Sequence, residues 1–411
     1  MLELDFVQTL AFAGIALLLG EGLRRQVPIL ARYNLPAPVL GGLLVAVAVL
    51  IARGQNVDLV QFDTTLQSPL MIAFFTTIGF GASLSLLRVG GPQVLVFTLI
   101  CTALAIMQTV VGALVATLVG RPPLFGVLNG SVTLAGGPAT GLAFAPLFES
   151  AGVAGASTVA VAAAMVGIVS GGLIGGPIGT VLVGRLHARR ARHAAAAAGP
   201  HHLAQQIVEE QLHETRTTSA PPGEDRQSYA ILKALVLIMA AMWAGSWVSG
   251  RFEAAGLTLP AYIGAMLVAA VIRNVDDATG VVGLSQQTID DLGNVALSLF
   301  LVLALMTLRL WELAGLALPM IVILATQVAL IAAVSWPVFH MMGHDYDAAV
   351  MSGGLCGFML GTTANAMANM DALTTRYGPA PRAYLVVPMV GAFFIDFVNA
   401  VLITICLNIW T

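Results

Sequence analysis

Residues 347–370 read DAAVMSGGLCGFMLGTTANAMANM, an apolar stretch interrupted by glycine, threonine and asparagine. Residues 124–147, LFGVLNGSVTLAGGPATGLAFAPL, have the same character and align with them at a displacement of 222. Both are too polar for lipid-facing helices and too apolar for free loops. Irregular backbone survives at membrane depth only inside protein or facing water. Each stretch therefore predicts a re-entrant glycine-rich loop.

The rest of the chain predicts an all-α polytopic membrane protein. Of 411 residues, 58% are hydrophobic and 9% are charged, against about 25% charged in soluble domains. Apolar segments of the length that a bilayer requires recur along the chain, so we expect about 10 transmembrane helices. They lie near 6–22, 36–52, 69–87, 93–119, 154–184, 229–250, 257–272, 292–310, 316–341 and 382–410.

A second internal similarity divides the chain into two halves. Leu35-Pro36-Ala37 returns as Leu259-Pro260-Ala261, and Met165-Val166-Gly167 returns as Met389-Val390-Gly391. The predicted organisation is an N-terminal membrane repeat over 1–184, a solvated linker over 185–228 and a C-terminal repeat over 229–411. Five crossings per half make the repeats inverted, which is typical of secondary transporters. A channel is the alternative, since re-entrant loops also build pores.

The positive charges predict the orientation in the membrane. With both termini outside, 14 of the 18 lysines and arginines fall on the inner side, as the positive-inside rule requires. The linker is then cytoplasmic. We expect no cleavable signal peptide, because Glu3 and Asp5 stand where its positive region belongs.

Several function classes are not expected. Lys233 is the only lysine and follows no glycine-rich phosphate loop, which argues against ATP hydrolysis. The three cysteines lie far apart in apolar segments, and no basic cluster indicates nucleic-acid binding. No catalytic arrangement emerges, so we expect neither an enzyme nor a cofactor.

One carboxylate stands inside an apolar run. Asp396 lies ten residues into residues 386–409, where an acidic side chain costs about 2.5–3.5 kcal/mol. Asn399 is three residues further on, on the same helix face. Asp396 is a candidate cation ligand or counter-ion to a substrate ammonium. With Asn399 and the carbonyl of Gly361 it forms the candidate Na⁺ set.

Four segments resemble the bacterial sodium/glutamate symporter family. They are YNLPAPVLGGLL at 33–44, MIAFFTTIG at 71–79, the run 292–313, and LVVPMVGAFFIDFVNA at 385–400. The resemblance implies Na⁺-coupled uptake of L-glutamate by alternating access across a bacterial inner membrane. It also implies two inverted halves with re-entrant loops and a homodimer.

The loops depart from the family pattern at two positions where histidine is common. Pro138 follows Gly136-Gly137, and Leu355 follows Gly354. A symporter of another small carboxylate or amino acid, driven by Na⁺ or H⁺, therefore stays an alternative. Glutamate would need donors from the loops, and the candidate substrate-binding residues are Ser131, Thr133, Gly136, Gly137, Thr140, Thr362, Thr363, Asn365 and Asn369.

Overall fold

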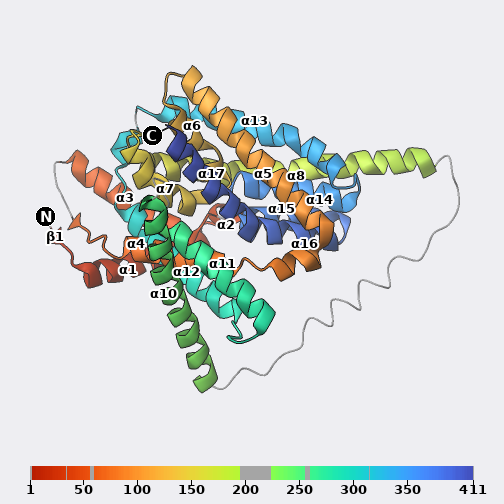
Figure 1. The fold of residues 1–411 in the computed structure, drawn as a ribbon. Helices are drawn as coiled ribbons and strands as arrows, with labels where there is room; N and C mark the ends of the chain where they lie inside the picture. Colours follow the sequence, from red (N-terminus) through yellow and green to blue (C-terminus); the bar gives the residue numbers. More distant parts are fainter. Residues whose placement is uncertain are drawn as a thin grey trace.

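The computed structural model describes residues 2–33, 35–55, 60–194, 224–254, 260–313 and 315–410. Most of the predicted linker, residues 195–223, lies outside the described residues. The described part is almost entirely helical (Figure 1). Its elements are β1 Leu2–Glu3, α1 Phe6–Gln26, α2 Pro28–Arg32, α3 Ala37–Gly54, β2 Val60–Gln61, α4 Gln67–Phe80, α5 Leu84–Leu118, α6 Pro123–Val127, η1 Leu128–Val132, α7 Gly137–Ser150, α8 Ala156–Ala194, α10 Glu224–Ala254, α11 Ala261–Thr279, α12 Gln286–Met306, η2 Leu310–Leu313, α13 Ala317–Met341, α14 Tyr346–Met359, α15 Thr363–Tyr377, α16 Pro381–Met389, η3 Val390–Phe394 and α17 Ile395–Trp410.

The prediction of a multi-pass membrane protein is confirmed. Among the described residues, seven helices are long and apolar enough to cross a bilayer, and they lie in α1, α3, α5, α8, α10, α12 and α13. The other three predicted spans are not among these seven. α4 has 14 residues, α11 ends in a charged turn, and the last span is divided among α16, η3 and α17. The total of ten crossings stays a prediction.

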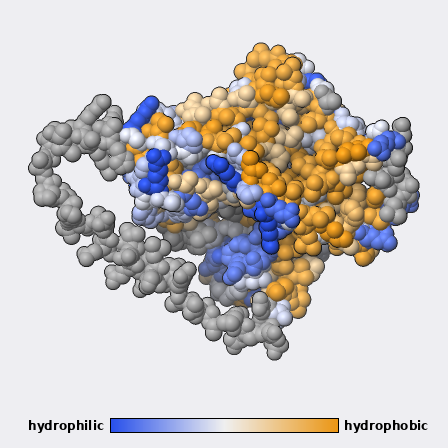
Figure 2. Space-filling model, turned by 180° about the vertical axis from the view of Figure 1, so that it is seen from behind, coloured by the Kyte–Doolittle hydropathy of each residue, from blue (hydrophilic) through white to orange (hydrophobic). Residues whose placement is uncertain are grey.

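Large apolar side chains cover much of the surface. Leu18, Leu118, Trp243 and Leu318 are each more than 70% exposed. Figure 2 shows a continuous hydrophobic area across one face of the molecule. A soluble monomer rarely exposes apolar patches of more than a few hundred Å², so this surface is suited to contact with lipid.

The helices pack as two groups, and each group draws on both halves of the chain. The first group consists of α1, α3 and α4 together with α10, α11 and α12, which pack against one another. The second group consists of α5 to α8 together with α13 to α17. Figure 1 shows the two groups side by side. The first three long helices of each half thus join one group, and the remaining helices join the other.

The loop after α11 is held by a carboxylate and by the only lysine. Asp276 accepts hydrogen bonds from the backbone N–H groups of Val282, Gly283 and Leu284 at 2.8–2.9 Å. The ammonium group of Lys233 on α10 donates to the carbonyl groups of Val282 and Gly283. Burial raises the pKa of the Asp276 carboxyl, but the three donors and Arg273 outweigh it, so the pKa lies below its ordinary value.

A pH-dependent loss of stability follows from this loop. A carboxyl group whose pKa is depressed in the folded state stabilises the fold above its unfolded-state pKa of about 3.9. This stabilisation is lost as the pH falls through the folded-state pKa. We expect Asp276→Ala to lower the free energy of unfolding by about 1–3 kcal/mol at pH 7 and to lose this difference in acid. Thermal unfolding in detergent at pH 7 and below pH 4 measures it. Asp291→Ala, an exposed neighbour, is the control, and an equal effect of both changes would contradict the prediction.

Candidate functional site

Both glycine-rich stretches contain a helix break. In the first, α6 continues into the π-helical turn η1, where Gly130 has non-helical φ and ψ angles. The chain then leaves the helix at residues 135–136, and α7 begins at Gly137. Gly137 has φ 67°, a left-handed conformation that glycine adopts without strain. Pro138 follows in the first turn of α7, where its missing N–H removes no helical hydrogen bond.

The second break separates α14 from α15 at residues 360–362. Thr362 caps α15, and its hydroxyl accepts a hydrogen bond from the backbone N–H of Asn365 at 3.4 Å. A Cβ atom placed on Gly137 would lie 3.7 Å from the carbonyl oxygen of Gly361. The two breaks, more than 220 residues apart in sequence, therefore lie next to each other.

A cavity of about 780 Å³ opens beside the two breaks, between the two helix groups. The first turns of α7 and α15 line it, so unpaired N–H groups at two helix N-termini are placed to favour an anion there. The second group contributes Ala135, Gly136, Gly137, Pro138, Ala139, Phe358, Gly361, Thr362, Thr363, Ala364, Gly391 and Asp396. The first group contributes Leu17, Leu18, Glu21, Arg24, Pro36, Ala37, Pro38, Phe74, Ile78, Asn294, Leu297, Ser298 and Leu301.

Six of the twelve candidate site residues line this cavity. They are Gly136, Gly137, Gly361, Thr362, Thr363 and Asp396. Asp396 lies in the first turn of α17, directly after the π-helical turn η3. The cavity therefore brings together both glycine breaks and the intramembrane carboxylate.

The other six candidates are buried and do not line the cavity, and the side chains of four of them donate hydrogen bonds to the backbone of the second helix group. Thr133 donates to the carbonyl of Leu128, and Thr140 is 4% exposed within α7. Asn365 and Asn369, one turn apart on α15, donate to the carbonyls of Ile168 and Gly171 on α8. Ser131 and Asn399 are joined, because the amide of Asn399 donates to the Ser131 carbonyl at 2.9 Å. In this structure these side chains support the breaks rather than line the cavity.

The two departures from the family pattern have different surroundings. Pro138 lines the cavity, where it provides neither an N–H nor a polar side chain. Leu355 is fully buried in the apolar interior of α14. Of these two changes, only the one at Pro138 alters the groups that line the cavity. A third departure, Ala364-Asn365 where the family commonly has Pro-Thr, places Ala364 in the lining as well.

The first helix group contributes polar residues that the sequence pattern does not single out. Arg24 and Glu21 lie near the end of α1, 4.0 Å apart, and both line the cavity. Asn294 and Ser298, one turn apart on α12, line it too. From the sequence alone, Arg24 is only one of the positive charges that predict the orientation of the protein in the membrane. Its place near the start of α3 and opposite the breaks depends on tertiary packing.

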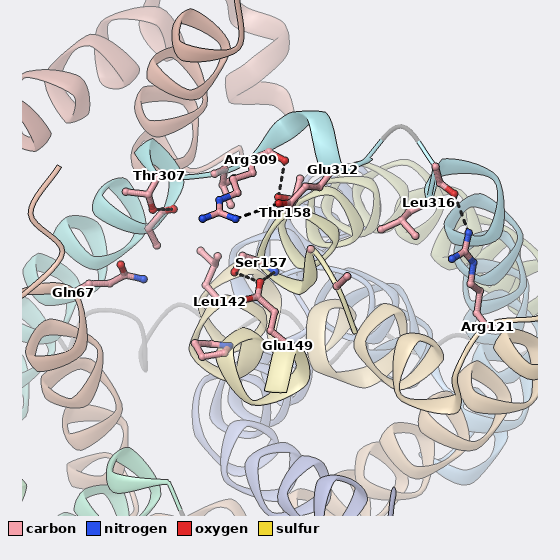
Figure 3. A pocket seen from close by; sticks show the side chains of 16 residues that line it. Gln67, Arg121, Leu142, Glu149, Ser157, Thr158, Thr307, Arg309, Glu312 and Leu316 are labelled. Carbon is pink, nitrogen blue, oxygen red and sulfur yellow. Dashed lines mark hydrogen bonds and ion pairs between the residues drawn. The ribbon is translucent and has the colours of Figure 1, made fainter. Parts of the chain in front are cut away.

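A second cleft of about 740 Å³ lies along the same boundary between the groups (Figure 3). Arg309 and Glu312 form an ion pair at 3.5 Å, and Glu149 accepts a hydrogen bond from Ser157 at 3.1 Å. Arg121 donates to the carbonyl of Gly315 at the edge of the cleft.

The same two helices line both cavities. On α7, Ala139 faces the first cavity and Leu142 the second, and on α12, Leu301 faces the first and Ala304 the second. Three residues correspond to about one helical turn. The barrier between the two cavities is therefore thin along these helices.

The apolar helices, the paired helix breaks and the cavity between two helix groups define a multi-pass membrane protein with an internal cavity. The sodium/glutamate symporter family model matches residues 2–379. The chain is 42% identical to the sodium/glutamate symporter of Escherichia coli (strain K12) over 99% of this chain and 98% of that protein. It is 38% identical to the sodium/glutamate symporter of Haemophilus influenzae, over 97% and 96%. The chain belongs to the sodium/glutamate symporter family.

Proposed function

We propose that this protein takes up L-glutamate together with Na⁺ by alternating access. The observation that carries the proposal is the cavity in which two helix N-termini, Arg24 and Asp396 meet between the two helix groups. The family to which the chain belongs and the names of the two relatives support this choice of substrate and ion.

The cavity has the charges that glutamate requires. Its two carboxylates need donors, which the first turns of α7 and α15 and the guanidinium of Arg24 would provide. Its ammonium group, or a Na⁺ ion, needs an acceptor, and Asp396 faces the same space. The hydroxyls of Thr362 and Thr363 add neutral donors.

Alternating access is supported by the position of the two cavities. Both lie on the boundary between the helix groups, and both use α7 and α12. Movement of the second group, which carries both breaks, against the first would expose the site to one cavity and then to the other. Coupling then requires that Na⁺ and substrate favour the same arrangement.

The proposed setting is the bacterial inner membrane, with both termini outside and the linker in the cytoplasm. The excess of arginine on the predicted inner side supports this orientation. Arg–Trp contacts support a membrane-interface position, with Arg53 over Trp311 and Arg185 over Trp336 at 4.0 and 4.4 Å. The inverted relation of the halves, the re-entrant insertion of both loops and the homodimer stay predictions.

A symporter of another small carboxylate is the second candidate, because Pro138 lines the cavity at a position where the family commonly has histidine. Coupling to H⁺ through Asp396 is the corresponding alternative for the ion. A channel is less favoured, since the boundary between the helix groups contains two separate cavities in the described part of the chain.

Uptake of labelled L-glutamate into proteoliposomes tests the proposal. We expect accumulation against a gradient when Na⁺ is outside, and none with K⁺ or with a pH gradient alone. Unlabelled aspartate and dicarboxylates serve as competitors. Failure of folded protein to take up glutamate would overturn the choice of substrate. Equilibration of glutamate across the membrane without accumulation against a gradient would indicate a channel.

Arg24 supplies a sharper test of the cavity. We expect Arg24→Ala to raise the KM for glutamate about tenfold, because a charge-assisted hydrogen bond worth about 1.5–3 kcal/mol is removed. Arg25→Ala is the matched control, since Arg25 is the next residue and also binds Glu21 but does not line the cavity. Equal KM values for the two variants would show that Arg24 does not bind substrate.

A further inference from the structure

Five buried side-chain amides share an unusual hydrogen-bonding state. In each, the nitrogen donates to a backbone carbonyl, whereas the oxygen is buried without a hydrogen-bond partner among the described residues. Only the nitrogen of an amide can donate to a carbonyl, so these contacts also fix which atom is the oxygen. The five residues are Gln108, Asn129, Gln327, Asn365 and Asn399.

Four of these amides surround the π-helical turn η1. Asn129 belongs to the turn, and Asn399 donates to its Ser131 carbonyl at 2.9 Å. A Cβ atom on Gly130 would lie 2.9 Å from the backbone carbonyl oxygen of Gln108 and 3.3 Å from Nε2 of Gln327. Thr109 adds a hydroxyl that lies 2.8 Å from the Ser131 hydroxyl. We call Gln108, Asn129, Gln327 and Asn399 the amide cluster.

The two glutamines are also joined directly. Nε2 of Gln327 donates to the backbone carbonyl of Gln108 at 2.7 Å, across 219 residues of sequence. α5 and α13 thus each place a glutamine against the same turn.

The unpartnered groups of the cluster are all acceptors. Leaving a buried acceptor unsatisfied costs about 1–3 kcal/mol, and unpartnered buried groups commonly mark an unseen water or ion. Neutral amide oxygens are hard ligands that suit an alkali cation. All four side chains are fully buried, and none of them lines either of the two large cavities. A small dehydrated cation therefore fits the cluster better than an organic substrate.

We propose that the amide cluster binds a Na⁺ ion through neutral oxygens, as a site separate from Asp396. This inference rests on the proposed function, in which Na⁺ drives uptake. The cluster contacts both helix breaks: η1 leads directly into the first, and Gln108 donates to the carbonyl of Met359 just before the second. An ion held here would order both breaks before glutamate binds, which gives the differential affinity that coupling requires.

The test uses the full chain with changes in Gln327. Gln327→Leu removes both the oxygen and the N–H donor to the Gln108 carbonyl. Gln327→Glu also removes that donor but keeps an oxygen and adds a negative charge. Ser335→Ala is the matched control, because Ser335 is a buried polar residue on the same helix whose hydroxyl is fully satisfied. Two quantities are measured: the Na⁺ concentration for half-maximal glutamate uptake, and the rise in unfolding temperature on adding Na⁺ in place of K⁺.

We expect Gln327→Leu to raise the half-maximal Na⁺ concentration at least tenfold and to abolish the Na⁺-specific rise in unfolding temperature. Gln327→Glu should lower the half-maximal concentration, and Ser335→Ala should match the unaltered protein. Unfolding in Na⁺-free buffer shows which variants are folded. If Gln327→Leu is not folded, Gln327→Glu and Gln108→Glu decide the question.

Unchanged Na⁺ dependence in folded Gln327→Leu would overturn the site and assign the amide oxygens to ordered water. If Gln327→Leu does not fold, unchanged Na⁺ dependence in both Gln327→Glu and Gln108→Glu would also overturn the site. Failure of the proposed function is distinct, because the unaltered protein would then show no Na⁺-driven glutamate uptake. The rise in unfolding temperature is measured without glutamate, so it reports on the ion site whatever the substrate.

Discussion

In the Asp396→Asn variant, Na⁺-driven glutamate uptake is expected to fall at least 30-fold while the protein remains folded. Among the described residues, Asp396 is the only carboxylate that the second helix group contributes to the cavity. Removing one partner of a desolvated charge pair costs about 2–5 kcal/mol, and each 1.4 kcal/mol corresponds to a factor of ten. Initial uptake rates in proteoliposomes, normalised to reconstituted protein, measure the loss.

Two further variants separate the roles of this residue. Asp396→Glu keeps the charge and should retain part of the uptake, whereas Asp371→Asn, an exposed position on α15, should have no effect. If Asp396→Asn retains full Na⁺-dependent uptake, the residue is neither a cation ligand nor the counter-ion of the substrate. Uptake that instead follows a pH gradient in the unaltered protein, and is lost in Asp396→Asn, would favour H⁺ coupling.

Substitution of Gly126 by leucine is expected to prevent folding of the second helix group. A Cβ atom on Gly126 would lie 1.9 Å from the carbonyl oxygen of Gly112, and one on Gly112 would lie 2.4 Å from that of Gly126. Both obstructing atoms are backbone, so α5 and α6 would have to separate. We expect a loss of at least about 3 kcal/mol, at the upper end of the usual cost of overpacking.

The yield of monodisperse protein and its unfolding temperature in detergent measure this effect. Gly176→Leu is the matched control, because Gly176 lies on α8 in the same helix group and a Cβ atom placed on it would meet no other atom within 4 Å. The control should behave like the unaltered protein. A Gly126→Leu protein with normal yield and uptake would show that the contact between α5 and α6 opens without cost.

Part of the candidate site is readable from sequence because its signals are local. The glycine clusters predict breaks in apolar helices, and both breaks occur inside the predicted stretches. A carboxylate within an apolar run can also be recognised from the sequence. Asp396, predicted in this way, lines the cavity. The hydroxyl and amide residues beside the breaks are less informative, since their short side chains satisfy backbone groups as readily as they face a ligand.

Composition and hydrophobic periodicity determined that this protein is a multi-pass helical membrane protein with two interrupted stretches. These features depend only on the residues within each segment and on the lipid or water around it. Only the tertiary structure decided that Arg24 lines the cavity, that Leu355 does not, and that Gln108 meets Gln327. These contacts join helices that lie up to several hundred residues apart. Which faces meet depends on the packing of two helix groups drawn from both halves, and a pattern within one segment contains no information about its distant partner.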